Sequence, residues 1–136
     1  MDIRQINEHY AEIGAGLIDT EPALVDIKNS QATIIYLSSE HPKKTDGKLV
    51  FGQCEKVADK YKWGIPCDYT ITVFEPNVEK FTEEQLKILI FHELLHIDIL
   101  FNADGTETHN IKGHDLEDFR LIIDRFGTDW SDTDAD

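Results

Sequence analysis

The sequence has few cysteines, few basic residues and no long apolar segment, and each shortage excludes a class of protein. Cys54 and Cys67 are the only cysteines, and they do not form a CxxC pair. Two thiols in this arrangement support neither a disulfide framework nor a four-cysteine metal site. No apolar run approaches the length of a membrane span, and the N-terminus lacks the pattern of a secretory signal. We therefore expect a cytoplasmic protein with reduced thiols and no membrane partner.

The shortage of positive charge bears on the partners. The chain has 13 lysines and arginines against 27 aspartates and glutamates, which gives a formal net charge of −14 at pH 7. This charge disfavours contact with phosphate backbones and favours cationic partners, so we expect no direct binding of nucleic acid. A chain of 136 residues fits one hydrophobic core. We predict a single domain over residues 1–127, followed by an acidic tail at 128–136.

The first half of the chain predicts one helix and a small sheet. Apolar residues recur at steps of three and four from Ile3 to Leu17, which is the spacing of a helix over about residues 3–17. Runs rich in β-forming residues predict strands at 32–38, at 48–57 with a bulge at Gly52, and at 68–75. We expect an α+β fold with an N-terminal helix and a sheet of three or four strands.

A strong helix start lies at Thr82. Thr82 and Gln85 have the spacing of a capping box. The apolar residues that follow go nearly all the way round a helix as far as Leu100, which predicts a core helix buried on several sides. After a loop, the apolar spacing at 116–126 predicts a C-terminal helix that Gly127 ends.

The predicted core helix contains the stretch FHELLHIDILF. His92 and His96 are four residues apart, so both rings project from one face of a helix and can reach one ion. With Glu93 they form the HExxH arrangement, in which two neutral imidazoles hold Zn²⁺ and the glutamate acts on water. Without a metal, three polar groups in an apolar helix would each need another partner. We predict that His92 and His96 bind zinc and that Glu93 is the general base.

A third ligand is expected downstream, because a catalytic zinc usually takes three protein ligands and keeps one position open. The scheme HExxHxxGxxH fails, because Ile99 and Asn102 stand at its glycine and its third histidine. We prefer His114 to His109. Asp115 can cap a helix that begins there, and the start of an ordered element fixes a ligand better than a loop does.

Four carboxylates near these histidines are weaker candidates. Glu117 and Asp118 can supply a carboxylate ligand in place of a third histidine, although solvated or capping carboxylates are the commoner case. Asp98, Asp115 and Asp118 are candidates to accept the remaining N–H of a ligand imidazole. The sequence does not choose among them.

A family resemblance rests on the segments HELLHI and GHDLEDF, which follow the predicted strand DYTITVFE. Together they resemble the phage-type metallopeptidases and, more distantly, the SprT-like zincins. The resemblance covers about residues 32–126 and implies a minimal zincin-like domain with zinc on His92, His96 and His114 and with Glu93 as catalytic base. It implies hydrolysis of a peptide or protein substrate. SprT-like proteins continue into a zinc ribbon or a basic DNA-contacting region, whereas this chain has an acidic tail, so a DNA-repair role is not implied.

Two alternatives come from other functional classes. An acidic nucleic-acid mimic, or another inhibitory binding protein, would use the charge to occupy a basic site on a partner. The acidic residues are spread along the whole chain, however, and a mimic leaves the HExxH segment unexplained. A metal-binding pseudoenzyme would fill the fourth coordination position with His109 or Glu117. A chelator separates the classes, because a mimic is indifferent to it.

Overall fold

The computed structural model describes residues 4–113, 122, 125–127 and 130–131, and its architecture is α+β. A mixed four-stranded sheet has the order β1-β2-β6-β5, in which β2 and β6 are parallel and the two outer strands are antiparallel to their neighbours. The strands are β1 Arg4–Ile6, β2 Ile34–Ser39, β5 Gly52–Lys56 and β6 Tyr69–Phe74. The expected class and the expected small sheet are confirmed.

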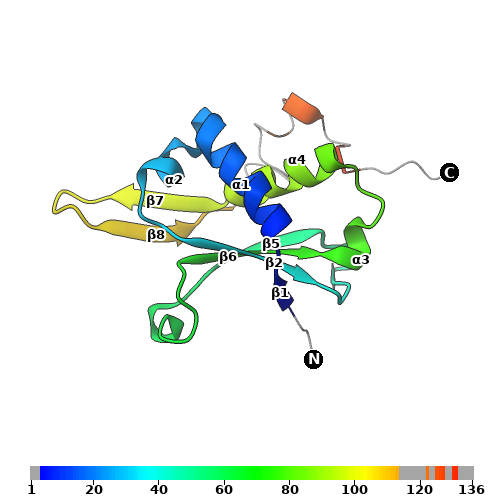
Figure 1. Ribbon diagram of the computed structural model, residues 1–136, viewed down its shortest axis with the longest axis horizontal. Helices are drawn as coiled ribbons and strands as arrows, with labels where there is room; N and C mark the ends of the chain where they lie inside the picture. The colour runs from blue at the N-terminus through cyan, green and yellow to red at the C-terminus, as the bar shows by residue number, and fades with distance from the viewer. Residues whose placement is uncertain (1–3, 114–121, 123–124, 128–129, 132–136) are drawn as a thin grey trace.

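Helices cover one face of this sheet (Figure 1). They are α1 Glu8–Thr20, α2 Val25–Asn29 and α4 Glu83–Leu94, while the short α3 Glu75–Val78 follows β6. Short 3₁₀ turns lie at Pro22–Leu24 and Asp59–Tyr61. Two small hairpins complete the described fold, β3 Lys44–Thr45 with β4 Lys48–Leu49 and β7 Ile97–Phe101 with β8 Glu107–Ile111. The described residues include no helix that is both long and apolar enough to cross a membrane.

The core lies between the sheet and the helices. Tyr69, Ile71 and Val73 alternate along the central strand β6, and each is 0% exposed. Leu94 and Ile90 of α4 belong to the same buried cluster and are also 0% exposed. Burial of such large side chains contributes about 1.5–3 kcal/mol each, so this contact fixes α4 on the sheet.

The N-terminal helix begins later than predicted. Asn7 is its N-cap, and the side chain accepts a hydrogen bond from the backbone N–H of Tyr10 at 3.0 Å. The chain before Asn7 is the edge strand β1, in which Ile6 is 66% exposed. The apolar spacing from Ile3 was therefore misread as helix, because a cap at Asn7 competes with continued helix on its N-terminal side.

The second predicted strand divides into β4 and β5, and the predicted bulge at Gly52 is wrong. The pairing of β5 with β6 runs without an extra residue from Gly52 opposite Val73 to Lys56 opposite Tyr69. A glycine in a strand has a second common explanation, which is the close approach of another group. At position 52 that group belongs to α4.

The core helix ends earlier than predicted. The helix stops at Leu94, and Ile97 begins strand β7. The chain turns after Phe101, and β7 pairs with β8. Ile97 and Ile99 are buried, whereas Leu100 is 52% exposed, which is a period of two rather than a helical period. The prediction failed because a continuous apolar run does not distinguish a buried helix from a strand. The predicted C-terminal helix at 116–126 lies largely outside the described residues.

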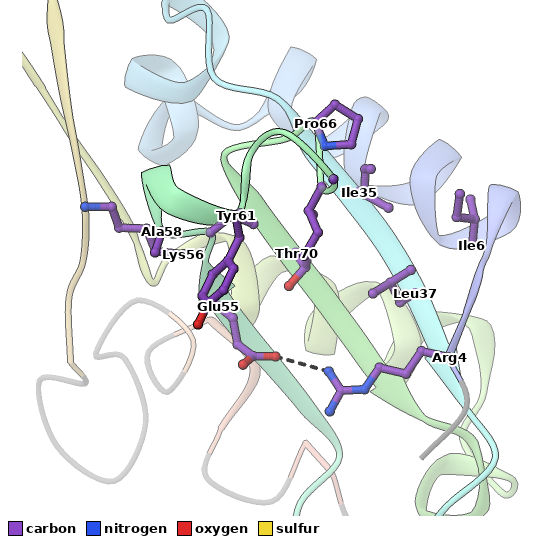
Figure 2. Close-up of a pocket in the computed structure, with 13 residues that line it drawn as sticks. Arg4, Ile6, Ile35, Leu37, Glu55, Lys56, Ala58, Tyr61, Pro66 and Thr70 are labelled. Carbon is purple, nitrogen blue, oxygen red and sulfur yellow. Dashed lines mark hydrogen bonds and ion pairs between the residues drawn. The ribbon is translucent and has the colours of Figure 1, made fainter. Parts of the chain in front are cut away.

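The other face of the sheet carries a groove of about 610 Å³ (Figure 2). Its floor includes Ile35 and Leu37 of β2, and Tyr61 lies at one side. Arg4 donates a hydrogen bond to Glu55 across it at 3.1 Å. No histidine or cysteine is among the described residues that line this groove.

Candidate active site

The start of α4 sets the position of the HExxH segment along the sheet. The predicted capping box is present: Thr82 Oγ1 accepts a hydrogen bond from the Gln85 backbone at 3.1 Å, and Gln85 Oε1 accepts one from the Thr82 backbone at 2.9 Å. Phe91 and Leu94 are 1% and 0% exposed. Because these two residues hold one side of the helix in the core, His92 and Glu93 are presented at its border with β5.

The two histidines of the motif lie side by side. The ring centroids of His92 and His96 are 5.3 Å apart, with an angle of 59° between the ring planes. His96 lies beyond the last residue of α4, but Leu95 keeps a right-handed helical backbone, with φ −67° and ψ −16°. The final helical turn is therefore continued far enough to keep both rings on one side.

Backbone groups of Lys112, just after β8, hold His96. The Nδ1 atom of His96 donates a hydrogen bond to the Lys112 carbonyl oxygen at 2.7 Å, and the Lys112 N–H donates to the His96 carbonyl oxygen at 2.8 Å. Because a carbonyl can only accept, Nδ1 carries the proton in the neutral ring, and Nε2 carries the lone pair. This is the tautomer that a metal ligand requires, with its second nitrogen oriented by a backbone carbonyl.

An aromatic residue far along the sequence, Trp130, packs against His92. The Trp130 ring lies 6.1 Å from the His92 ring, and it also contacts the Phe81 ring edge-on at 6.5 Å. Gln85 Nε2 donates to the Trp130 carbonyl oxygen at 3.2 Å, which ties this part of the chain to the first turn of α4. His92 is thus oriented by ring packing, which is a different kind of support from that of His96.

Glu93 is a buried carboxylate at the same place. It is 4% exposed, and its Oε2 lies 4.0 Å from His92 Nε2. The same oxygen faces Gly52 of β5, where a Cβ atom would lie 3.3 Å from it. A buried carboxylate beside two imidazoles is an arrangement that accepts and donates protons.

These side chains open into a cleft of about 350 Å³ between α4, β5 and the end of β8. Its described lining consists of Gly52, Gln53, Cys54, His92, Glu93, His96, Ile111, Lys112 and Gly113. Burial raises the pKa of the Cys54 thiol, and the nearby charges of Glu93 and Glu55 raise it further. Cys54 therefore stays a neutral thiol and is not prepared to act as a nucleophile.

Of the two histidines after the motif, His109 is the one that the structure describes, and it faces carboxylates outside this cleft. Its Nε2 lies 3.0 Å from Glu107 Oε1, and its Nδ1 lies 3.6 Å from Asp68 Oδ1. The ring also packs on Tyr69 at 5.7 Å. Both ring nitrogens are engaged there, so His109 joins β8 to the start of β6.

Asp98 and Tyr69 complete the connection between the hairpin and the sheet. The Tyr69 hydroxyl donates to the backbone carbonyl oxygen of Asn110 at 3.0 Å, and Asp98 lies opposite Asn110 in the β7–β8 pair.

Four of the predicted ligands and partners, His114, Asp115, Glu117 and Asp118, lie outside the described residues. Among the residues that are described, no group of three or more histidine, cysteine or acidic side chains is placed to hold a metal. Two of the predicted ligands and the predicted base are therefore gathered, and the third predicted ligand is not described.

Sequence reasoning missed three residues that shape this site, namely Gly52, Lys112 and Trp130. Gly52 had a signal, because a glycine in a strand often marks a close approach. Lys112 contributes only backbone groups, which leave no trace in the residue type. Trp130 stands alone in an acidic segment, and an isolated aromatic residue does not reveal its partner.

Comparison with known proteins places the chain in one family. The family model described as "Putative phage metallopeptidase" matches residues 4–135, which is nearly the whole chain. No curated protein and no solved structure matches the chain. The match includes His92, His96 and also the segment that contains His114.

Proposed function

The chain belongs to the family described as phage metallopeptidases, and we propose that it is a zinc-dependent peptidase of the HExxH type whose active site is the cleft at the end of α4. Membership of this family makes a metal ion and protein substrates part of the expected chemistry. The observation that carries the proposal is the pair of histidine rings 5.3 Å apart, with Glu93 Oε2 4.0 Å from the first of them.

Zinc would be held by His92, His96 and His114. The bond from His96 Nδ1 to the Lys112 carbonyl supports this assignment, because it places the lone pair on Nε2, the nitrogen through which a metal ion would bind. His114 is preferred to His109 as the third ligand, since both ring nitrogens of His109 already face carboxylates. When bound, zinc supplies a Lewis acid that makes water more acidic and polarises a carbonyl group.

Glu93 would move the proton in the reaction. Its carboxylate would take a proton from the attacking water and then deliver it to the nitrogen of the leaving amine. Burial at 4% exposure keeps bulk water from competing for that proton and keeps the carboxylate in one orientation. The short distance between Glu93 and His92 supports this role, because the base must lie within reach of the water that a metal on His92 would activate.

An extended substrate would bind along β5. This strand is an edge of the four-stranded sheet, and Gly52, Gln53 and Cys54 line the cleft. The free edge of a strand offers backbone donors and acceptors to an added peptide strand. A peptide paired with β5 would cross the cleft beside Glu93.

Replacement of the proposed base tests the mechanism. We expect Glu93→Gln to lower the turnover of a cleaved peptide about 10²- to 10⁴-fold while the zinc content stays the same, because only the proton carrier is removed. Glu84→Gln is the matched control, since it makes the same change at an exposed residue of the same helix. Unchanged turnover in Glu93→Gln would contradict the mechanism. Bound zinc without any turnover in the native protein would favour a metal-holding binding module.

A further inference from the structure

Gly52 lies directly against the carboxylate of Glu93. A Cβ atom at position 52 would lie 3.3 Å from Glu93 Oε2 and 3.3 Å from Glu93 Cγ. It would also lie 3.3 Å from Cδ1 of Leu89, which precedes Glu93 by one helical turn. These distances are at the short limit of carbon contacts in a packed protein, so any side chain here would press on Glu93.

The backbone does not explain the glycine. Among the described residues, the glycines with positive φ are Gly47, Gly105 and Gly127, and Gly52 is not one of them. Gly52 pairs in register with Val73, which is ordinary strand geometry. A glycine inside a strand is less favourable than alanine because it loses more backbone freedom on folding, and no conformational need explains it here. The space that its missing side chain leaves for Glu93 is the remaining reason.

The crowded oxygen is also the one that faces His92. Oε2 lies 4.0 Å from His92 Nε2 and 3.3 Å from the position that a Cβ atom of residue 52 would take. Phe51, the residue before Gly52, is anchored by ring packing on Phe81 at 5.0 Å, so the strand cannot easily move away. A side chain at position 52 would therefore shift the carboxylate rather than the strand.

We infer that Gly52 is a positioning residue for Glu93: it leaves the space that the carboxylate occupies beside His92, within reach of the water that it would deprotonate. This inference rests on the proposed function for its catalytic consequence. The contact itself is independent of that function. A displacement of 1 Å at an active site can cost about 10²-fold in rate, so a shift of a few tenths of an ångström has a measurable effect.

The first experiment measures kcat, KM and zinc content for Gly52→Ala. We expect kcat to fall about tenfold while KM and zinc content stay within about twofold, because the base moves and the histidines do not. Gly16→Ala is the matched control, since a Cβ at Gly16 would meet no atom within 4 Å and its φ is not positive. In a Glu93→Gln background, Gly52→Ala should cause no further loss, because the group it displaces no longer carries the proton.

The second experiment does not depend on catalysis. It compares the melting temperatures of the metal-free native protein, Gly52→Ala, Glu93→Ala and the double variant. Gly52→Ala should lower the melting temperature when Glu93 is present and should lower it less in the Glu93→Ala background, because Glu93 supplies two of the three crowding atoms and Leu89 supplies the third. The change in melting temperature that Gly16→Ala causes should be the same with and without Glu93→Ala.

The two experiments separate the possible failures. If native protein hydrolyses no peptide but the melting temperatures show the coupling, the proposed function fails and the contact stands. If Gly52→Ala retains native kcat in an active enzyme, the positioning role is overturned. An additive loss in the Glu93→Gln background would also overturn it, because the effect of Gly52 would then act through another group.

Discussion

His92 and His96 belong to one short motif, yet different parts of the molecule hold them. His92 lies inside α4 and packs against Trp130, which follows it by almost forty positions in the printed sequence. His96 lies after the helix and is held by two hydrogen bonds to backbone groups of Lys112, one from its ring and one to its carbonyl oxygen, at the end of the β7–β8 hairpin. Ring packing on Trp130 therefore supports one ligand candidate, and hydrogen bonds to the hairpin backbone support the other.

This difference shows that the spacing of the motif is not sufficient for the site. A helix alone would place two rings on one face, but it would leave both free to rotate about their side-chain bonds. The Lys112 carbonyl selects the tautomer of His96, and the ring of Trp130, which itself packs on Phe81, restricts the space around His92. Metal affinity should therefore respond to changes far from the motif, and more strongly on the His96 side.

Loss of the Lys112 backbone contact should have the larger of these two effects. Lys112→Pro removes the N–H that donates to the His96 carbonyl, and the fixed φ of proline should displace the carbonyl of residue 112, to which His96 Nδ1 donates. We expect zinc affinity to fall about 10- to 100-fold, as it does when the outer partner of a ligand histidine is lost. Lys112→Ala keeps both backbone groups and should bind zinc as the native protein does. Equal zinc affinity of Lys112→Pro and Lys112→Ala would contradict the proposal that backbone groups of Lys112 support His96.

Loss of the Trp130 ring should have a smaller effect on the His92 side. Aromatic contacts contribute about 0.5–1.5 kcal/mol, so Trp130→Ala should weaken zinc binding about two- to tenfold in a competition titration with a chelator. Trp63→Ala is the matched control, because Trp63 is 90% exposed and lies outside the described cleft lining. A loss in Trp130→Ala as large as that in Lys112→Pro would show that packing is as important as the backbone bond.

Much of the fold was predictable because its local signals are strong. The capping box at Thr82 and Gln85 fixed the start of α4, and the alternation after Asp68 predicted β6. The end of α4 was not found, although Ile97 and Ile99 alternate with Asp98 and Leu100, and Asp104 and Gly105 form a turn dipeptide typical of hairpins. A long apolar run before these residues obscured that period.

The site was predictable only in its residue types. His92, Glu93 and His96 are recognisable because polar groups in an apolar segment need a reason. Their supports are tertiary: a backbone carbonyl, an isolated tryptophan and a glycine that leaves space. None of these has a spacing relative to the motif that could be read from the chain, since each comes from a different element.

The zinc content of the purified protein tests the central claim most directly. It should be measured by elemental mass spectrometry for native protein, His96→Ala and His114→Ala after the same mild chelation. We expect about one zinc per chain in the native protein and loss of zinc from both variants, because a catalytic site of this type needs three protein ligands. Native protein that holds no metal even after zinc is supplied would contradict the account, and the acidic nucleic-acid mimic would then become the favoured function.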